Sequence, residues 1–112
     1  KATRGAPRGT DLVMSYHIVA PKAQADLDGI WEAVAEVDQD AADGLVDGLT
    51  ARLPILARFP HLGRLRTQVA PGIRSFSYRR YLILYRVVDE GVQIVRVVHG
   101  RRDVEAILRD TD

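Results

Sequence analysis

The residue types best suited to chemistry gather toward the C-terminus, where residues 95–104 read VRVVHGRRDV. Cleaving RNA without a metal needs a base for the 2′-hydroxyl proton, a cation for the charge of the phosphorane and an acid for the leaving oxygen. The residues that could fill these roles are His99, Arg74, Arg101, Arg102 and one of Tyr78, Tyr81 or Tyr85. A structural role competes with this interpretation, because a histidine that ends a strand commonly hydrogen-bonds a neighbour and arginines are commonly exposed.

Other kinds of site are excluded by what the sequence lacks. Without cysteine it has no thiolate ligand or nucleophile, and the histidines at positions 17, 61 and 99 do not have the spacing of metal ligands. The glycines are scattered rather than gathered in a phosphate-binding loop, and no serine has the context of a hydrolase nucleophile. We therefore expect neither a metal nor a cofactor.

Length and charge limit the classes of protein and partner. A chain of 112 residues builds one domain, and its apolar runs are too short to span a bilayer, so we expect a cytoplasmic protein without a membrane partner. Residues 1–10 carry a charge of +3, residues 11–51 carry −8 and residues 52–112 carry +6, which together give the net +1. The basic half should therefore face an acidic or phosphate-bearing partner.

Two helices are predicted in the first half of the chain. Apolar residues at 27, 30, 31, 34 and 35 recur with helical spacing and predict a helix over about residues 22–37; its acidic residues at 26, 28, 32 and 36 are assigned to a solvated face. A second apolar stripe predicts a helix from residue 39, and the short link makes the pair an antiparallel hairpin. Pro54 should kink the second helix or end its regular part, because proline lacks a backbone donor.

Four strands and a last short helix complete the predicted fold. The strands are residues 16–20, 73–78, 81–88 and 92–98, and the helix falls within residues 101–109, with Asp103 as its cap. The order β-α-α-β-β-β-(α) predicts an α+β fold, in which the helical hairpin packs on a mostly antiparallel four-stranded sheet.

The N-terminal residues are set apart by composition. Residues 1–13 are rich in glycine, proline and arginine, so we interpret them as a flexible extension, of native or non-native origin, and residues 14–112 as a single domain. A basic arm that binds nucleic acid is the alternative interpretation of the same residues.

The two predicted turns imply a register for the last three strands. Turns at residues 79–80 and 89–91 pair positions that sum to 159 and to 180. One face of the sheet would then carry Arg74 opposite Tyr85, and Tyr81 opposite His99. The other face would carry Arg86 and Arg96 with four apolar residues: Leu82, Leu84, Ile94 and Val98. A slip of one residue in either turn would exchange the faces.

Four short segments, together with this order of elements, resemble the RelE/ParE superfamily of toxins from bacterial type II toxin–antitoxin systems. They are FPHLGR (59–64), PGIRSF (71–76), YLILYRV (81–87) and IVRVVHGRRD (94–103). The resemblance covers about residues 16–108 and is closer to the ParE branch. It implies a toxin that poisons DNA gyrase, arrests growth or stabilises a plasmid, and is neutralised by a cognate antitoxin whose C-terminal segment wraps around it.

The RelE branch, which cleaves mRNA on the ribosome, is the alternative that the resemblance leaves open. Members of that branch use lysines, arginines and a terminal tyrosine or histidine. Here the sheet and the loop before it contain no lysine, no tyrosine follows Arg102, and no acidic residue occurs between Asp47 and Asp89. These departures favour a gyrase inhibitor over an endoribonuclease, and no sequence-specific contact with nucleic acid is expected.

The resemblance also suggests which residues act. Toxicity or partner binding is assigned to one histidine and four arginines: Arg74, Arg96, His99, Arg101 and Arg102. All of these except Arg96 would be catalytic if the RelE-like alternative held. Antitoxin binding is assigned to Leu82, Leu84, Arg86 and Ile94. If the tail matters for toxicity, truncation after Arg102 should abolish killing and spare antitoxin binding.

Overall fold

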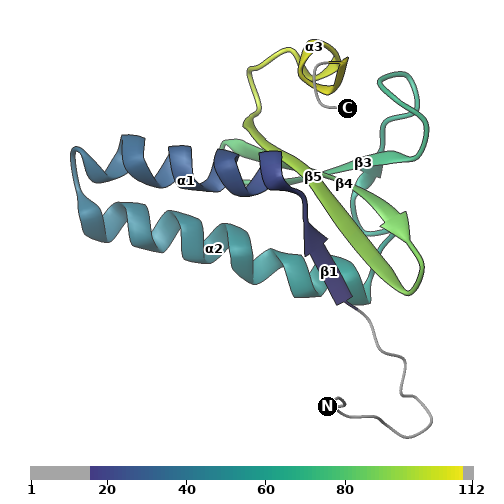
Figure 1. Cartoon of the computed structure of the whole chain (residues 1–112), viewed down its shortest axis with the longest axis horizontal. Coiled ribbons are helices and arrows are strands. Elements are labelled where there is room, and N and C mark those ends of the chain that lie inside the picture. The colour runs from purple at the N-terminus through teal and green to yellow at the C-terminus, as the bar shows by residue number, and fades with distance from the viewer. Residues whose placement is uncertain (1–15, 110–112) are drawn as a thin grey trace, which may run out of the picture.

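The computed structural model describes residues 16–109, which fold as a helical hairpin, a twisted sheet and a short third helix (Figure 1). The predicted extension, residues 1–13, lies outside the described range. The elements in chain order are β1 (Tyr16–Val19), α1 (Pro21–Ala35), α2 (Gln39–Arg58), β2 (Arg64–Leu65), β3 (Ile73–Tyr78), β4 (Tyr81–Val88), β5 (Gly91–His99) and α3 (Val104–Arg109). The predicted α+β fold is confirmed.

The helical hairpin forms as its sequence pattern predicts. Pro21 occupies the first turn of α1, where a missing donor costs nothing, and the Asp38 carboxylate caps α2 by accepting from the Ala41 N–H at 3.1 Å. Pro54 does not end the regular part of α2, which continues to Arg58. Proline removes only one donor there, and buried residues on both sides of it, Leu53 and Leu56, hold the helix against the sheet.

The sheet has five strands rather than the expected four, in the order β1-β5-β4-β3-β2. β1 runs parallel to β5 and the remaining pairs are antiparallel. The additional strand, β2, pairs Arg64 with Ser75 and Leu65 with Arg74. Two residues are too short to produce an alternating pattern, which is why the sequence did not reveal this strand.

The predicted register is confirmed for β3 and β4 and for half of β4 and β5. Arg74 lies opposite Tyr85, and Tyr81 lies opposite His99. A bulge then shifts the β4–β5 register, so that Tyr85 faces Ile94 and Val95 is the extra residue. The prediction that Ile94 shares a face with Leu82, Leu84 and Val98 is therefore wrong, because one added residue reverses the alternation beyond it.

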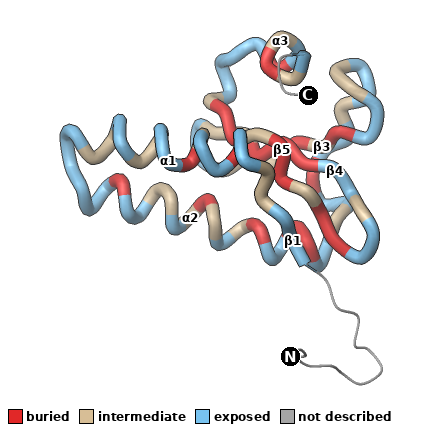
Figure 2. Tube along the Cα trace, in the orientation of Figure 1, coloured by how far each residue is buried: buried red, intermediate tan, exposed pale blue. Residues whose placement is uncertain are grey.

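A separate hydrophobic core lies on each face of the sheet. The larger core lies between the hairpin and the sheet and includes Leu49, Leu56, Ile83, Tyr85 and Ile94. On the opposite face, Val104 and Ile107 of α3 pack against Leu84 and Val98. Figure 2 shows buried segments concentrated in β3, β4 and β5, whereas the loop that joins α1 to α2 is exposed. None of the helices within residues 16–109 has both the length and the apolar character to cross a membrane.

Candidate functional site

The ends of three neighbouring strands bring the candidate chemical residues together at one end of the sheet. β3 ends at Tyr78 opposite Tyr81, the first residue of β4, and Tyr81 lies opposite His99, the last residue of β5. Beyond the strands, the Gly100 N–H donates to the Arg80 carbonyl at 2.8 Å. That bond ties the β3–β4 turn to the segment that follows β5, so two arginine pairs meet: Arg79 with Arg80, and Arg101 with Arg102.

His99 is held from two sides. Its ring packs edge-on against Tyr81, with 5.5 Å between ring centres, and its Nδ1 accepts a hydrogen bond from the Arg101 N–H at 3.1 Å. This hydrogen bond occupies the Nδ1 lone pair, so Nε2 is the ring nitrogen left to contact a ligand. In this arrangement the Nδ1 of His99 is not free to act as a base.

A hollow of about 310 Å³ opens beside these residues. Its lining is Ser77, Arg79, Arg80, Tyr81, Leu82, His99, Gly100 and Arg101, and we call it the arginine hollow. A second hollow next to the same turn is lined by Arg79, Arg80 and Tyr81 together with apolar residues of the hairpin: Val34, Ala41 and Leu45. No carboxylate of the described residues lines either hollow. The arrangement can therefore bind an anion but lacks a carboxylate base.

Eight of the twelve arginines within residues 16–109 form two groups that differ in their partners. Four are half-buried and bonded to the protein through their side chains: Arg52, Arg66, Arg74 and Arg96. The second group lies at the strand ends and is exposed: Arg79, Arg80, Arg101 and Arg102. None of these four forms an ion pair with a carboxylate of residues 16–109. Their charge remains available to a partner.

Arg74 belongs to the bonded group. Its guanidinium donates to the Gly63 carbonyl at 2.7 Å, and the Gly63 N–H donates to the Tyr85 hydroxyl at 2.8 Å. That hydroxyl in turn donates to the Pro60 carbonyl at 2.7 Å. Burial raises the pKa of the Tyr85 phenol, so the hydroxyl keeps its proton at neutral pH. The side chains of Arg74 and Tyr85 therefore fix the loop after α2.

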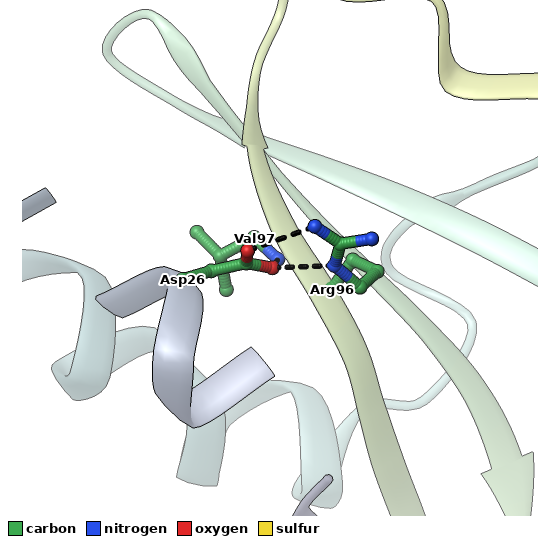
Figure 3. A network of polar contacts seen from close by, with 3 residues as sticks. All are labelled: Asp26, Arg96 and Val97. Carbon is green, nitrogen blue, oxygen red and sulfur yellow. Dashed lines mark hydrogen bonds and ion pairs between the residues drawn. The ribbon is translucent and has the colours of Figure 1, made fainter. Parts of the chain in front are cut away.

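Arg96 is bonded to the first helix (Figure 3). The Asp26 carboxylate accepts from Arg96 Nε at 2.7 Å and from its terminal nitrogen at 2.9 Å, and it also accepts from the Val97 N–H at 2.9 Å. β1 ends at Val19, opposite Ile94, so Val97 has no strand neighbour on that side. The Asp26 carboxylate provides the acceptor for the Val97 N–H that a neighbouring strand would otherwise provide.

The assignment of Asp26 to a solvated helix face is therefore wrong. A signal was present in the sequence: Asp26 lies three residues after Ala23 and four before Ile30, and both pack in the larger core. It therefore lies within the apolar stripe of α1 rather than opposite it. The prediction that Asp103 caps the last helix is confirmed, since its carboxylate accepts from the Ala106 N–H at 3.2 Å.

The four residues assigned to antitoxin binding do not share one surface in this structure. Leu84 and Ile94 are fully buried, in the cores on opposite faces of the sheet. Leu82 is half-buried beside the smaller core, and Arg86 is exposed at a separate hollow with Gln93 and Val95. Within residues 16–109, no group of three or more histidine and carboxylate side chains is placed to hold a metal ion.

Comparison with known proteins identifies the family to which the chain belongs. Toxin ParE1 of Mycobacterium tuberculosis is 35% identical over 95 residues, which cover 81% of this chain and 95% of the relative. Toxin ParE3 of Caulobacter vibrioides is 34% identical over 84 residues, which cover 74% and 84%. Among solved structures, the chromosomal ParDE toxin–antitoxin system from P. aeruginosa matches with a TM-score of 0.66 and 26% identity, covering 78% of this chain and 96% of that one.

The family model for the ParE toxin of the type II toxin–antitoxin system, parDE, matches residues 18–104, which span every described strand and helix at least in part. The arginine hollow lies inside this range. This chain belongs to the ParE family of type II toxins.

Proposed function

We propose that this toxin inhibits DNA gyrase in the cytoplasm by binding, without cleaving RNA, and that a cognate antitoxin neutralises it. The observation that carries the proposal is the composition of the arginine hollow, which combines exposed arginines with no carboxylate. Family membership supports a gyrase target, as the resemblance to the ParE branch implied.

The chemistry of the arginine hollow disfavours the RelE-like alternative. RNA cleavage needs a base that takes the 2′-hydroxyl proton, and the imidazole at this end of the sheet, His99, has its Nδ1 occupied by the Arg101 N–H. The surrounding guanidinium groups are hydrogen-bond donors with no acceptor. Guanidinium donors hold an anion in place but cannot take the proton of a 2′-hydroxyl.

An antitoxin partner is supported by the relative from P. aeruginosa, which was solved as a toxin–antitoxin system. Apolar side chains that a partner could cover are exposed on β1 and at the end of α2: Tyr16 and Ile18, and Ile55 and Phe59. Exposed apolar groups of this kind commonly mark a protein interface. We expect the antitoxin to bury part of this surface.

A supercoiling assay with purified gyrase tests the proposal. The wild-type chain should block supercoiling and accumulate cleaved DNA, and its antitoxin should reverse both effects. The double variant R101Q/R102Q should need at least about ten-fold more protein for the same inhibition, since removing a charged hydrogen bond weakens binding by a factor of this order. The control R64Q/R109Q removes two other exposed arginines, neither of which lines the arginine hollow, and should match the wild type.

A gyrase that is indifferent to the wild-type chain would refute the proposal, and mRNA cuts on stalled ribosomes would then support the RelE-like alternative. Truncation after Arg102 is a less selective test than the point variants. It removes Val104 and Ile107, which cover Leu84 and Val98, and so exposes the smaller core. Loss of killing by the truncated chain would therefore report misfolding as readily as a missing interaction with the target.

A further inference from the structure

We propose that the arginine hollow binds the phosphodiester backbone of DNA, so that the toxin holds the DNA of the gyrase complex directly. The biological setting rests on the proposed function, whereas the binding itself can be measured without gyrase. The inference has three supports: the convergence of two loops, the absence of carboxylate partners for their arginines among the described residues, where Arg79 contacts only the Tyr78 ring at 5.4 Å, and the kind of ligand that the lining fits.

The two loops are positioned by the backbone rather than by their own side chains. The Gly100–Arg80 hydrogen bond of 2.8 Å and the pairing of Tyr81 with His99 set the distance between them. Arg79 adopts a φ of 55°, a left-handed conformation that the tight turn imposes. Three arginines are thus held around one hollow at strand ends, where they do not need a ligand to bring them together.

The charges of these arginines are not neutralised within the described chain. Asp103 is the carboxylate nearest in sequence, and it is engaged in capping α3 through the Ala106 N–H. On the hairpin side, the turn faces apolar residues: Val34, Ala41 and Leu45. Like charges that are gathered without a counterion raise the free energy of the unbound protein, and an anion that enters the arginine hollow relieves this repulsion.

The lining fits a phosphate better than an acidic protein surface. Guanidinium groups match the oxygens of a phosphate in pairs, and Ser77, Tyr81 and His99 add further potential donors around the same space. A protein partner would normally be anchored by a large apolar side chain in a closed pocket, yet Leu82 is the sole aliphatic residue in the lining. Contacts to phosphates position a protein on DNA without reading sequence, which agrees with the expectation of no sequence-specific binding.

The test is a titration of a fluorescein-labelled 20-base-pair duplex of arbitrary sequence with the full chain, at salt concentrations of 50 to 200 mM. The variant R79Q/R101Q should bind at least about ten-fold more weakly, and the slope of log affinity against log salt should fall by about 1.8, or about 0.9 for each phosphate that is no longer neutralised. The control R64Q/R109Q removes the same charge at exposed positions outside the arginine hollow. It should keep the affinity within about two-fold. The first ten residues keep their three basic side chains in every variant, so the difference reports the arginine hollow.

Two results would overturn the inference. Equal losses of affinity in R79Q/R101Q and R64Q/R109Q would mean that DNA senses only the total charge. Tighter binding of a polyglutamate peptide than of the duplex would assign the arginine hollow to an acidic protein surface. A second measurement does not depend on variants: on addition of duplex, the amide resonances of Gly100 and Arg101 should shift more than that of Arg64, and the reverse order would also overturn it.

The same variants separate this inference from the proposed function. If R79Q/R101Q loses DNA binding but inhibits gyrase as well as the wild type does, DNA binding does not serve inhibition and the inference fails, while the gyrase target stands. If the wild type binds DNA through the arginine hollow but leaves gyrase active, the proposed function fails and the DNA site stands.

Discussion

Replacing Asp26 removes the side chain that joins α1 to the end of β5, and its cost can be estimated from the geometry. The carboxylate accepts three hydrogen bonds, two from Arg96 and one from the Val97 N–H. Breaking a fully buried ion pair costs about 3–5 kcal/mol, and an exposed pair contributes about 0–1 kcal/mol. Because the Arg96 and Asp26 side chains are 17% and 16% exposed, we expect Asp26→Ala to cost about 2–3 kcal/mol.

Asp26→Asn should cost less, about 1–2 kcal/mol. Its amide oxygen can still accept from Arg96 Nε and from the Val97 N–H, as Oδ2 does in the wild type. Its amide nitrogen, however, replaces Oδ1 and places a donor against the donor that Arg96 presents there. The variant therefore keeps the acceptor for the strand and loses the charge.

Urea unfolding followed by circular dichroism measures both costs, and the thermal midpoint should fall by about 4–8 °C for each kcal/mol. The matched control is Asp28→Asn on the same helix, where an exposed carboxylate accepts from Gln24 alone; it should stay within about 0.5 kcal/mol of wild type. The structural argument is refuted if Asp26→Ala costs no more than this control. It is also refuted if the costs of Asp26→Ala and Arg96→Ala simply add in the double variant, because paired residues should show a coupling of about 1–2 kcal/mol.

Two further changes test how the loop after α2 and the hairpin are packed. Tyr85→Phe removes the hydroxyl between Pro60 and Gly63 and should cost about 1–3 kcal/mol in urea unfolding. Because burial raises the pKa of Tyr85 in the folded state above 10.0, the tyrosine favours folding below about pH 10 and loses that contribution as the pH rises further. The stability difference between wild type and Tyr85→Phe should therefore shrink above this pH, and a constant difference would contradict the burial of the phenol. Gly48→Ala should cost about 1–3 kcal/mol by thermal melting, since the new Cβ would overlap the ring of Tyr78. The control Gly44→Ala, with open space around the added Cβ, should stabilise α2 by about 0.5–1 kcal/mol, and equal effects at the two positions would contradict the packing.

The parts of the fold that the sequence predicted are those in which a local pattern repeats. The apolar stripe through Leu27 and Ile30 predicted α1, and the two short turns predicted the pairing of Arg74 with Tyr85 and of Tyr81 with His99. The bulge at Val95 left no such signal, because apolar residues occupy consecutive positions on both sides of Arg96, at Ile94 and Val95 and at Val97 and Val98, and they fit either register. The Asp26–Arg96 pair joins residues that are 70 positions apart, so no local pattern could predict it.

The sequence predicted where in the fold the candidate residues gather, but it did not predict all of the residues that gather there. Of the five residues assigned to toxicity, His99, Arg101 and Arg102 lie at the converging strand ends, whereas Arg74 and Arg96 are bonded within the protein. Arg79 and Arg80 were missed as site residues, although the same pairing rule that places Tyr81 opposite His99 places them opposite Arg101 and Gly100. The sequence therefore contained the information that places Arg79 and Arg80 at the site, but it lay in the strand register and not in a motif.

This division of the arginines makes two kinds of inactive variant distinguishable. Arg96 acts through Asp26 on the position of β5, so Arg96→Ala should lower toxicity only as far as it lowers the urea midpoint. Arg101 is exposed and its side chain lines the arginine hollow, so R101Q should lower toxicity while the free energy of unfolding stays within about 0.5 kcal/mol of wild type. The growth of cells that express each variant, compared with the urea unfolding curve of the same variant, shows whether toxicity is lost with or without a loss of stability. A fully toxic R101Q, or a stable but inactive Arg96→Ala, would mean that the bonded arginines, and not the exposed ones, meet the target.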